Sequence, residues 1–547
     1  MYRELIVPSA KYVSEELQQV GKLPPIIYPI NQRIAYDYIV DCYSDISVKK
    51  IICHDGIDMV RNQLENYQDS GIQIIEIDRL LDLGYSVYIA IKNLRCPIII
   101  NFADTILLEE KEIPNEDCFL YTYDYPSDMW TFFDEKNGII EKIWDKEHFT
   151  GNTEKRLFVG VFSIKDTSFF SECLEKALIN KNNEKNSFYF ALMEYSQKHR
   201  MKAIQTERWF DVGHGSKYLV SNIAVKERTF NHIEIDKNRG ILKKTSEVKE
   251  KFIGEILWYM KIPTDVEYIR PRIFSYSTNY MNPYIKMEYY SYHTLHELFL
   301  YGKLDYQKWA KIFKMIHFVL EDLGRYTISD KYISSSLEDM YLKKTLDRFR
   351  QMEKMEYFEK LFNEIISINE KKYVSLNKLM KILEVEIPQR LYGITSFQII
   401  HGDLCFSNIL VDNNYAFLKL IDPRGSFGHY DIYGDRRYEL AKILHSLEGN
   451  YDSIIKEHFF LQYEKEKNKI NYKIKKPIFD FDVLELFIKV FDLQGEELEN
   501  IRFIESLLFL SMIPLHEESR KQQYVMLAVG IELLSTVLDI EEEDEDV

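Results

Sequence analysis

Short apolar segments alternate with segments of helical periodicity over roughly the first 225 residues. The segment at 97–102 reads Pro-Ile-Ile-Ile-Asn-Phe, and such a nearly continuous apolar run is typical of a buried parallel strand. The alternation predicts an α/β domain, a doubly wound and mostly parallel sheet with helices on both faces. Its ligand site is expected beyond the carboxyl ends of the strands. The predicted strands are 5–7, 50–53, 72–77 and 97–102, and a helix is predicted near 34–42.

The pattern changes near residue 228. Two short strands with a polar turn at 236–239 predict a hairpin, and a helix and a further strand follow it. From residue 293 the pattern is mainly helical to the end, interrupted by a loop segment at 399–428. A small β-rich lobe before a larger helical lobe predicts a bilobal α+β fold. The strands of the small lobe are 231–235, 240–244 and 283–289, and its helix is 248–259. The predicted parts of the chain are 1–225, 226–292, 293–540 and an acidic tail at 541–547.

Composition narrows the class of protein. A chain of 547 residues is too long to fold around one compact core. Its 46% hydrophobic and 29% charged residues are ordinary for a globular protein. The net charge of −17 counts against a nucleic-acid partner, because phosphate backbones require a basic surface. We expect no membrane insertion and no signal peptide. The six cysteines are scattered without metal-ligand spacing, so we expect a cytoplasmic protein. Homo-oligomerisation is left open.

The segment 398–425 has acidic and amide side chains at a spacing that suits phosphoryl transfer. Asp403 precedes Asn408 by five residues, and Asp422 ends a strand-like segment at 417–421. Phosphoryl transfer needs a carboxylate to orient the attacking hydroxyl, oxygen ligands for Mg²⁺ and a lysine for the phosphates of ATP. The spacing of Asp403 and Asn408 is that of a kinase catalytic loop.

These residues carry a family resemblance. His401-Gly402-Asp403 with Asn408, followed by Asp422, resembles the aminoglycoside phosphotransferase and choline kinase superfamily. The resemblance implies that Asp403 is the catalytic base or orienting carboxylate. It also implies that Asn408 and Asp422 hold Mg²⁺, and that ATP is the phosphoryl donor. His401 is expected to brace the loop.

The small lobe should supply the remaining nucleotide contacts. We expect Lys244 to grip the phosphates and Glu255, on the following helix, to hold that lysine. Lys243 is the alternative to Lys244. The strand at 283–289 resembles the hinge between kinase lobes, and backbone groups near Glu288 and Tyr289 would then meet adenine. The alternative for that segment is an ordinary edge strand.

Further along, the segment 433–442 lies where related small-molecule kinases have Gly-Asp-x-x-x-Asp-Leu-Ala, with Asp435 at the first acidic position. Arg436 and Arg437 have two readings. They clamp an anionic acceptor, or they pair with acidic neighbours. A choline-type cation site, with core packing as the alternative, is suggested by Tyr289, Tyr290 and Tyr292.

Three N-terminal segments resemble nucleotidyltransferases that activate sugar phosphates or phosphocholine. They are 100–105 (Ile-Asn-Phe-Ala-Asp-Thr), 157–162 (Leu-Phe-Val-Gly-Val-Phe) and 209–216 (Trp-Phe-Asp-Val-Gly-His-Gly-Ser). The resemblance implies a GT-A-like domain in which Asp104 and Asp211 share Mg²⁺ beside CTP or another NTP. For each aspartate alone, a turn or helix cap is the alternative.

The N-terminal segment departs from that family in its phosphate loop. The family has a G-x-G-x-R loop and a Lys-Pro pair, whereas residues 7–13 read Val-Pro-Ser-Ala-Lys-Tyr-Val and Pro24 stands at the position of the lysine. Loss of the amide cradle should weaken NTP binding. Lys11, Lys22 and Lys146 are candidates to compensate, with plain surface lysines as the alternative.

The two resemblances together predict an ATP- and Mg²⁺-dependent phosphotransferase for a small alcohol or sugar hydroxyl. It is fused to a nucleotidyltransferase-like domain that would activate the product with an NTP. This order of domains resembles fused proteins of bacterial capsule and surface-polysaccharide biosynthesis. Two rival hypotheses are a kinase with a catalytically silent N-terminal binding module, and a double pseudoenzyme that serves as a scaffold.

Overall fold

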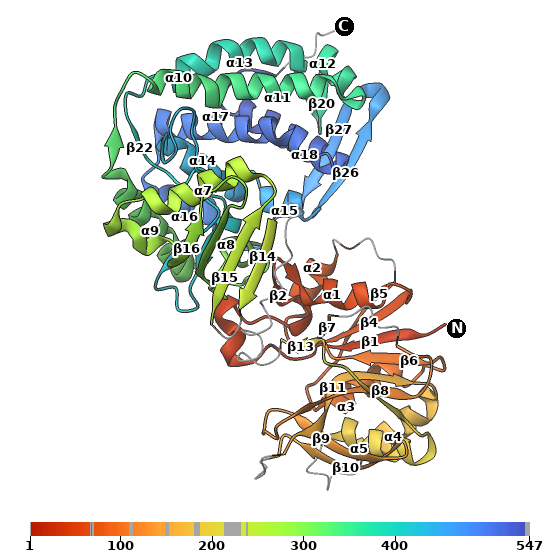
Figure 1. Cartoon of the computed structure of the whole chain (residues 1–547). Helices are drawn as coiled ribbons and strands as arrows, with labels where there is room; N and C mark the ends of the chain where they lie inside the picture. Colours follow the sequence, from red (N-terminus) through yellow and green to blue (C-terminus); the bar gives the residue numbers. More distant parts are fainter. Residues whose placement is uncertain are drawn as a thin grey trace. The chain divides into compact units, whose positions relative to one another are not determined.

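The computed structural model describes residues 2–65, 67, 71–108, 113–147, 153–179, 186–212, 231–236 and 239–541. Contacts divide the chain into two compact units (Figure 1). Unit 1 comprises Met1–Ala224 with Tyr301–Lys303, and unit 2 comprises Val225–Leu300 with Leu304–Val547. The predicted junction at 225/226 and the tail from residue 542 lie outside the described residues.

Unit 1 is built on a mixed nine-stranded sheet, counted over the described residues. The order is β10-β9-β11-β6-β1-β4-β5, with β8 between β11 and β12. Strands β6, β1, β4 and β5 pair in parallel, whereas β11 is antiparallel to β6, β8 and β9. Its strands are β1 (Glu4–Pro8), β2 (Pro29–Ile30), β3 (Arg33–Ile34), β4 (Val48–Cys53), β5 (Ile72–Glu76), β6 (Ile98–Asn101), β7 (Thr105–Leu107), β8 (Cys118–Asp124), β9 (Thr131–Lys136), β10 (Ile139–Asp145), β11 (Lys155–Ile164), β12 (Lys202–Gln205) and β13 (Trp209–Asp211).

The predicted α/β class is confirmed, but only part of the sheet is parallel. One cause is the hairpin of β9 and β10, whose turn residues Asn137 and Gly138 both have positive φ, 53° and 81°. Asn-Gly turns of this kind match the twist of two antiparallel strands and therefore favour a hairpin over a crossover.

Helices cover both faces of the parallel strands (Figure 1). On one face, Ile6, Ile52 and Ile100 form a continuous core with side chains of α3, α4 and α5. Asp82 begins α3, because its side chain accepts a hydrogen bond from the backbone N–H of Tyr85 at 2.9 Å. The helices of this unit are α1 (Ala35–Cys42), α2 (Ile57–Leu64), α3 (Leu83–Ile91), α4 (Thr167–Ile179) and α5 (Ser187–Lys198).

The small lobe of unit 2 is an antiparallel sheet in the order β14-β15-β17-β16. A long helix connects β15 to β16 along the chain. The predicted hairpin, helix and strand are all present, although turn residues 237–238 lie outside the described part. The elements are β14 (Asn231–Asp236), β15 (Ile241–Ser246), α7 (Lys249–Lys261), β16 (Ile273–Ser277) and β17 (Tyr284–Glu288).

The large lobe is mainly helical, as predicted. Its helices are α8 (Leu295–Leu300), α9 (Tyr306–Gly324), α10 (Ile333–Leu337), α11 (Lys344–Glu353), α12 (Glu359–Asn363), α13 (Leu376–Leu391), α14 (Arg436–Leu447), α15 (Tyr451–Ile455), α16 (Val483–Phe491), α17 (Gly495–Met512) and α18 (Arg520–Ser535). Short strands frame the loop segment, namely β18 (His293–Thr294), β19 (Thr327–Ile328), β22 (Phe397–Ile399), β23 (Ile409–Val411), β24 (Leu418–Leu420) and β25 (Tyr433–Gly434).

A four-stranded sheet in this lobe was not predicted. Its order is β21-β20-β27-β26, and it comprises β20 (Ile366–Ile368), β21 (Lys371–Tyr373), β26 (Phe459–Glu464) and β27 (Lys469–Ile474). Phe459, Leu461 and Tyr463 alternate as the less exposed side chains of β26, which is the period of a strand. The assignment of 459–474 to a helical region was therefore wrong.

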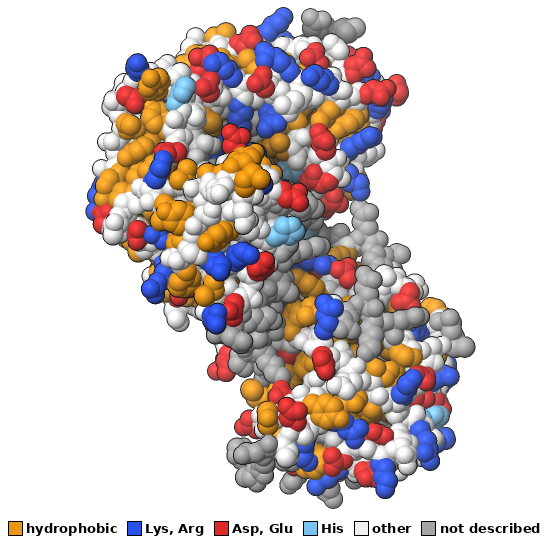
Figure 2. All heavy atoms as spheres, viewed as in Figure 1, with side chains coloured by type: hydrophobic (Ala, Val, Ile, Leu, Met, Phe, Trp, Pro, Cys, Tyr) orange, Lys and Arg blue, Asp and Glu red, His pale blue; other side chains and the backbone are white. Residues whose placement is uncertain are grey.

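Acidic and basic side chains are intermingled over the visible face of each unit (Figure 2). Within the described residues, no helix has both the length and the apolar character that a membrane crossing would require. None of the six cysteines, which all belong to the described residues, forms a disulfide bond.

Candidate active site

The loop after β22 fixes the carboxylate of Asp403 from two sides. Lys442 Nζ on α14 lies 2.9 Å from Asp403 Oδ1. Asn408 Nδ2 donates to the backbone oxygen of Asp403 at 2.9 Å and to Oδ2 at 3.3 Å. Burial alone would raise the pKa of Asp403, but the charge and hydrogen bond of Lys442 outweigh burial and lower that pKa. Asp403 is therefore an oriented, ionised carboxylate at neutral pH.

A hairpin brings Asn408 and Asp422 to the same end of two strands. Strands β23 and β24 pair antiparallel, and the N–H of Ile421 donates to the backbone oxygen of Asn408 at 3.0 Å. Asp422 follows with φ of 56°, a left-handed conformation that is uncommon outside glycine and concentrates at functional sites. Its N–H is held by the hydroxyl of Tyr259 at 3.0 Å.

Lys244 of β15 reaches its predicted partner Glu255 and also the predicted metal ligand Asp422. Its Nζ donates to the two carboxylate oxygens of Glu255 at 2.9 Å each and to Asp422 Oδ1 at 2.8 Å. Burial would lower the pKa of Lys244, but the charges of Asp422 and Glu255 raise it well above its ordinary value. Lys243, the alternative, instead pairs with Glu234 on the neighbouring strand β14 at 3.0 Å. The structure therefore brings Lys244, and not Lys243, to this carboxylate cluster.

Gly425 allows the segment after Asp422 to approach α7. Its φ is +67°, and a Cβ at this position would lie 2.2 Å from the backbone carbon and oxygen of Gly254. Any side chain here would push α7 away. Because Glu255 is the next residue of that helix, Gly425 helps to set the position of the Lys244 partner.

Glu439 is a buried residue of this site that the sequence analysis missed. One carboxylate oxygen accepts the N–H of His401 and the other accepts the N–H of Gly402, both at 2.8 Å. His401 itself lies within 2.9 Å of the backbone oxygen of Ile421 through Nε2. The Glu-Leu-Ala match at 439–441 could have identified Glu439, because it falls on the second acidic position of the Gly-Asp-x-x-x-Asp-Leu-Ala segment.

Asp435, Arg436 and Arg437 take part in acidic pairing. Arg437 Nη2 lies 2.8 Å from Asp435 Oδ2 and also donates to the backbone oxygen of Leu391 at 2.8 Å. Arg436 lies 3.5 Å from Glu497. The second reading of the two arginines, pairing with acidic neighbours, is the one the geometry supports.

The hinge-like segment is bonded within the small lobe. The N–H of Glu288 donates to the backbone oxygen of Arg272, and the N–H of Tyr289 to that of Gly240, both at 2.8 Å. These two amides are thus engaged by the sheet. Tyr290 and Tyr292 stack with ring centroids 5.3 Å apart.

In unit 1, strand pairing brings Asp104 and Asp211 close in space. Asp211 ends β13 opposite Thr105 of β7, and the N–H of Val212 donates to the backbone oxygen of Asp104 at 2.8 Å. Gly160 has φ of +94°, and a Cβ there would lie 2.6 Å from Thr105 Oγ1. Residues 213–216 of the resembling segment lie outside the described residues.

Two backbone amides of the segment at 7–13 donate hydrogen bonds to other segments of unit 1. The N–H of Ser9 donates to the backbone oxygen of Ile52 at 2.8 Å, and the N–H of Val13 to that of Leu23 at 2.9 Å. Two amides of the expected phosphate loop are thus engaged. Across the described ranges, no group of three or more His, Cys, Asp or Glu side chains has the geometry to hold a metal ion.

Comparison with known proteins gives neither a matching family model nor a matching curated protein. Solved nucleotidyltransferase structures are similar to the N-terminal region. The CTP:phosphocholine cytidylyltransferase of Streptococcus pneumoniae shares 14% identity over 41% of this chain and 100% of its own, with a TM-score of 0.35. The inositol-1-phosphate CTP transferase from T. maritima shares 13% over 40% and 91%, with a TM-score of 0.32. HddC from Yersinia pseudotuberculosis shares 15% over 41% and 100%, with a TM-score of 0.32. Similarity at this level carries no inference about activity.

Proposed function

We propose that unit 2 is an ATP- and Mg²⁺-dependent phosphotransferase that acts on a hydroxyl group of a small alcohol or sugar. The contact that supports this most directly is the one between Lys244 and Asp422, 2.8 Å long and joining residues 178 positions apart. Through this contact a buried lysine of the small lobe lies beside the aspartate for which the sequence predicts a role in metal binding. Glu255 holds the same lysine, as phosphate binding would require.

Asp403 would receive the acceptor. An alcohol that donates its hydrogen bond to Asp403 would keep its oxygen lone pairs available for attack on the γ-phosphorus of ATP. As the new O–P bond forms, the bond from the γ-phosphorus to the bridging oxygen of ADP breaks and the hydroxyl proton passes to Asp403. The low pKa of Asp403 means that it orients the hydroxyl first and accepts the proton only as the O–P bond forms.

The side chains of Asn408 and Asp422 suit Mg²⁺, because carboxylate and amide oxygens are its usual protein ligands. The side-chain nitrogen of Asn408 donates hydrogen bonds to Asp403, so Oδ1 is the Asn408 atom that would bind the cation. When bound, Mg²⁺ neutralises charge on the phosphates. Lys244 would then exchange part of its contact with Asp422 for the α- and β-phosphates.

A ligand screen tests this assignment. Full-length protein is heated with ATP and Mg²⁺ and with a panel of small alcohols and sugars, since a ligand of the native state raises the melting temperature. Hits are then assayed for ADP release. Asp403→Ala should abolish phosphorylation while nucleotide binding persists, and Asp422→Ala should remove the Mg²⁺-dependent part of nucleotide binding. Undiminished turnover by Asp403→Ala would refute the assignment.

For unit 1 we propose a nucleotidyltransferase-like role in which Asp104 and Asp211 hold the divalent cation beside CTP or another NTP. The adjacency of β7 and β13 supports this. The engaged amides of Ser9 and Val13 instead favour the silent binding module. Pyrophosphate release separates the two: full-length protein is incubated with each NTP and with candidate phosphorylated acceptors. Release that Asp211→Asn abolishes supports catalysis, and none across the panel supports the silent module.

The order of the two activities along the chain suggests a role in capsule or surface-polysaccharide biosynthesis. In that role, unit 2 would make a phosphorylated alcohol or sugar, and unit 1 would convert it to a nucleotide-activated form. Product analysis with ATP and an NTP supplied together tests the sequence of steps. The scaffold hypothesis predicts no ligand-dependent stabilisation and no turnover in either assay.

A further inference from the structure

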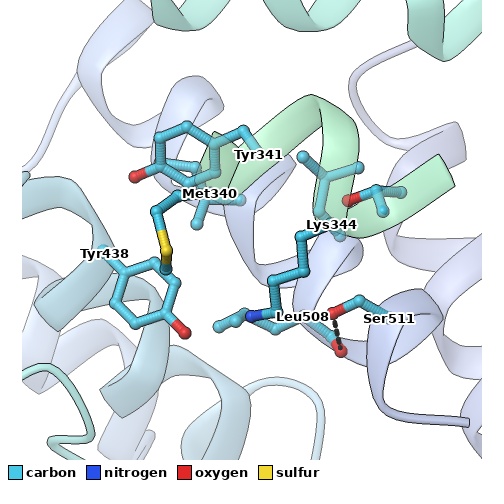
Figure 3. Close-up of a pocket in the computed structure, with 9 residues that line it drawn as sticks. Met340, Tyr341, Lys344, Tyr438, Leu508 and Ser511 are labelled. Atoms are coloured by element: carbon cyan, nitrogen blue, oxygen red, sulfur yellow. Dashed lines mark hydrogen bonds between the residues drawn. The ribbon is translucent and has the colours of Figure 1, made fainter. Parts of the chain in front are cut away.

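A small hollow in the large lobe lies among α11, α14 and α17 (Figure 3). It measures about 200 Å³ with the open solvent at its mouth included. The ammonium group of Lys344 and the hydroxyl of Tyr438 point toward one another across it, and Leu508 of α17 lines another side (Figure 3). The hollow thus combines apolar side chains with one cation and several hydroxyl groups, of which that of Tyr438 faces the lysine.

Helix α14 contributes one residue to this hollow and another to the contacts of the predicted catalytic carboxylate. Arg424 Nη1 donates to the hydroxyl of Tyr438 at 3.0 Å. One turn further along α14, Lys442 contacts Asp403 at 2.9 Å. An acceptor with its hydroxyl at Asp403 could therefore place another of its groups near Tyr438.

The charges around the hollow do not balance. Lys442 is neutralised by Asp403, and the nearby Asp435 by Arg437. Within the described part of the chain, neither Lys344 nor Arg424 has a carboxylate within 4.0 Å. Two cations thus lie beside the neutral hydroxyl of Tyr438, and partly buried cations are costly without a counter-charge.

The pKa shifts of Lys344 and Tyr438 agree with a positive local field. Burial lowers the pKa of Lys344 to about 8; Tyr438 opposes this shift, and the nearby charges of Arg424 and Lys442 add to it. Burial would raise the pKa of Tyr438, but Lys344, Arg424 and Lys442 bring it down to about 8. An anion in the hollow would raise both pKa values toward their ordinary values.

Resting on the phosphotransferase function proposed above, we propose that the acceptor carries an anionic oxygen group, a carboxylate or a phosphate, which binds between Lys344 and Arg424 beside Tyr438. The small size of the hollow means that only this group enters it, while the carbon skeleton with its hydroxyl lies toward Asp403. Charge-assisted hydrogen bonds from a lysine and an arginine would hold it. This assigns a substrate class, hydroxylated acids or sugar phosphates, where sequence reasoning left the acceptor unspecified.

The test measures occupancy of the hollow without requiring turnover. Full-length protein is labelled with acetic anhydride near neutral pH, and acetylation is read at Lys344 and at Lys343 by peptide mass spectrometry. Lys343 is a matched control on the adjoining turn, because it pairs with Asp339 at 2.9 Å and lies outside the hollow. The probes are inorganic phosphate and glycerate, compared with glycerol and with sodium chloride of equal ionic strength.

We expect phosphate and glycerate, but not glycerol, to slow acetylation of Lys344 about threefold at twice their dissociation constant, where two thirds of the sites are filled. Lys343 should be unaffected. Arg424→Gln, which removes the arginine that donates to Tyr438, should remove the protection. Arg436→Gln, which changes an arginine paired with Glu497, should retain it. Protection of both lysines alike, or of neither, would overturn the proposal.

ATP with Mg²⁺ is the remaining probe. Full protection of Lys344 by the nucleotide alone, with none from phosphate or glycerate, would assign the two cations to its terminal phosphate and overturn the acceptor assignment. The phosphotransferase function fails separately. If anions protect Lys344 but no alcohol is phosphorylated, the anion site stands and the kinase reaction does not.

Discussion

Replacing Glu439 by Gln tests whether α14 holds the catalytic loop. In the native protein the two carboxylate oxygens of Glu439 each accept a backbone N–H, from His401 and Gly402, at 2.8 Å. Gln offers one oxygen and one N–H₂ group, so one of these buried amides loses its acceptor. An unsatisfied buried amide costs about 1–3 kcal/mol, which corresponds to roughly 5–150-fold faster hydrogen exchange if the loop opens locally.

Hydrogen–deuterium exchange of a peptide that spans residues 397–410 measures this effect. Glu497→Gln, which changes a carboxylate more exposed than Glu439, is the control. Burial raises the pKa of Glu439 to about 7, although both N–H bonds oppose the shift. A protonated Glu439 resembles Gln, so the difference between native protein and variant should be small at pH 6 and grow toward pH 8. Equal exchange in Glu439→Gln and Glu497→Gln at pH 8 would refute the bracing role.

Three further predictions concern the same unit. Lys244→Met should lose most of the thermal stabilisation by ATP and Mg²⁺, about 2.7 kcal/mol at a hundredfold excess over the dissociation constant, whereas Lys243→Met should keep it; equal losses would contradict the assignment. Burial lowers the pKa of His401 to about 4, below its unfolded value of about 6.5, so its contribution to stability is lost as pH falls. Relative to pH 7.5, His401→Gln should remove about 2 kcal/mol of the destabilisation seen at pH 5, and an unchanged pH profile in urea unfolding would count against a buried neutral imidazole. Arg437→Gln should destabilise by about 3–5 kcal/mol, because it leaves a buried carboxylate without its counter-charge, and Arg436→Gln by less than about 1 kcal/mol; similar unfolding midpoints for the two variants would contradict this difference.

Local periodicity predicted the elements of this chain better than the contacts between them. The strand at 240–244 and the helix at 248–259 could be read from apolar spacing alone, and the structure has both. The antiparallel hairpin at Asn137 and Gly138 was missed although its turn residues were visible. Lys344 could not have been identified as a lining residue, because its importance comes from Tyr438, 94 positions away and on another helix. Such a meeting depends on helix packing, which no local pattern encodes.

Helix α14 carries three residues that contact either the hollow or the predicted catalytic loop of unit 2. Tyr438 and Lys442 are four residues apart, so they lie on one face of the helix, with the first at the hollow and the second at Asp403. Glu439 lies about 100° around the helix axis from Tyr438 and holds the loop that carries Asp403. A shift of this one helix would therefore move the anion site, the counter-charge of Asp403 and the support of its backbone together. The same coupling would let the acceptor's anionic group, by fixing Tyr438, stabilise the orientation of Asp403 toward the acceptor hydroxyl.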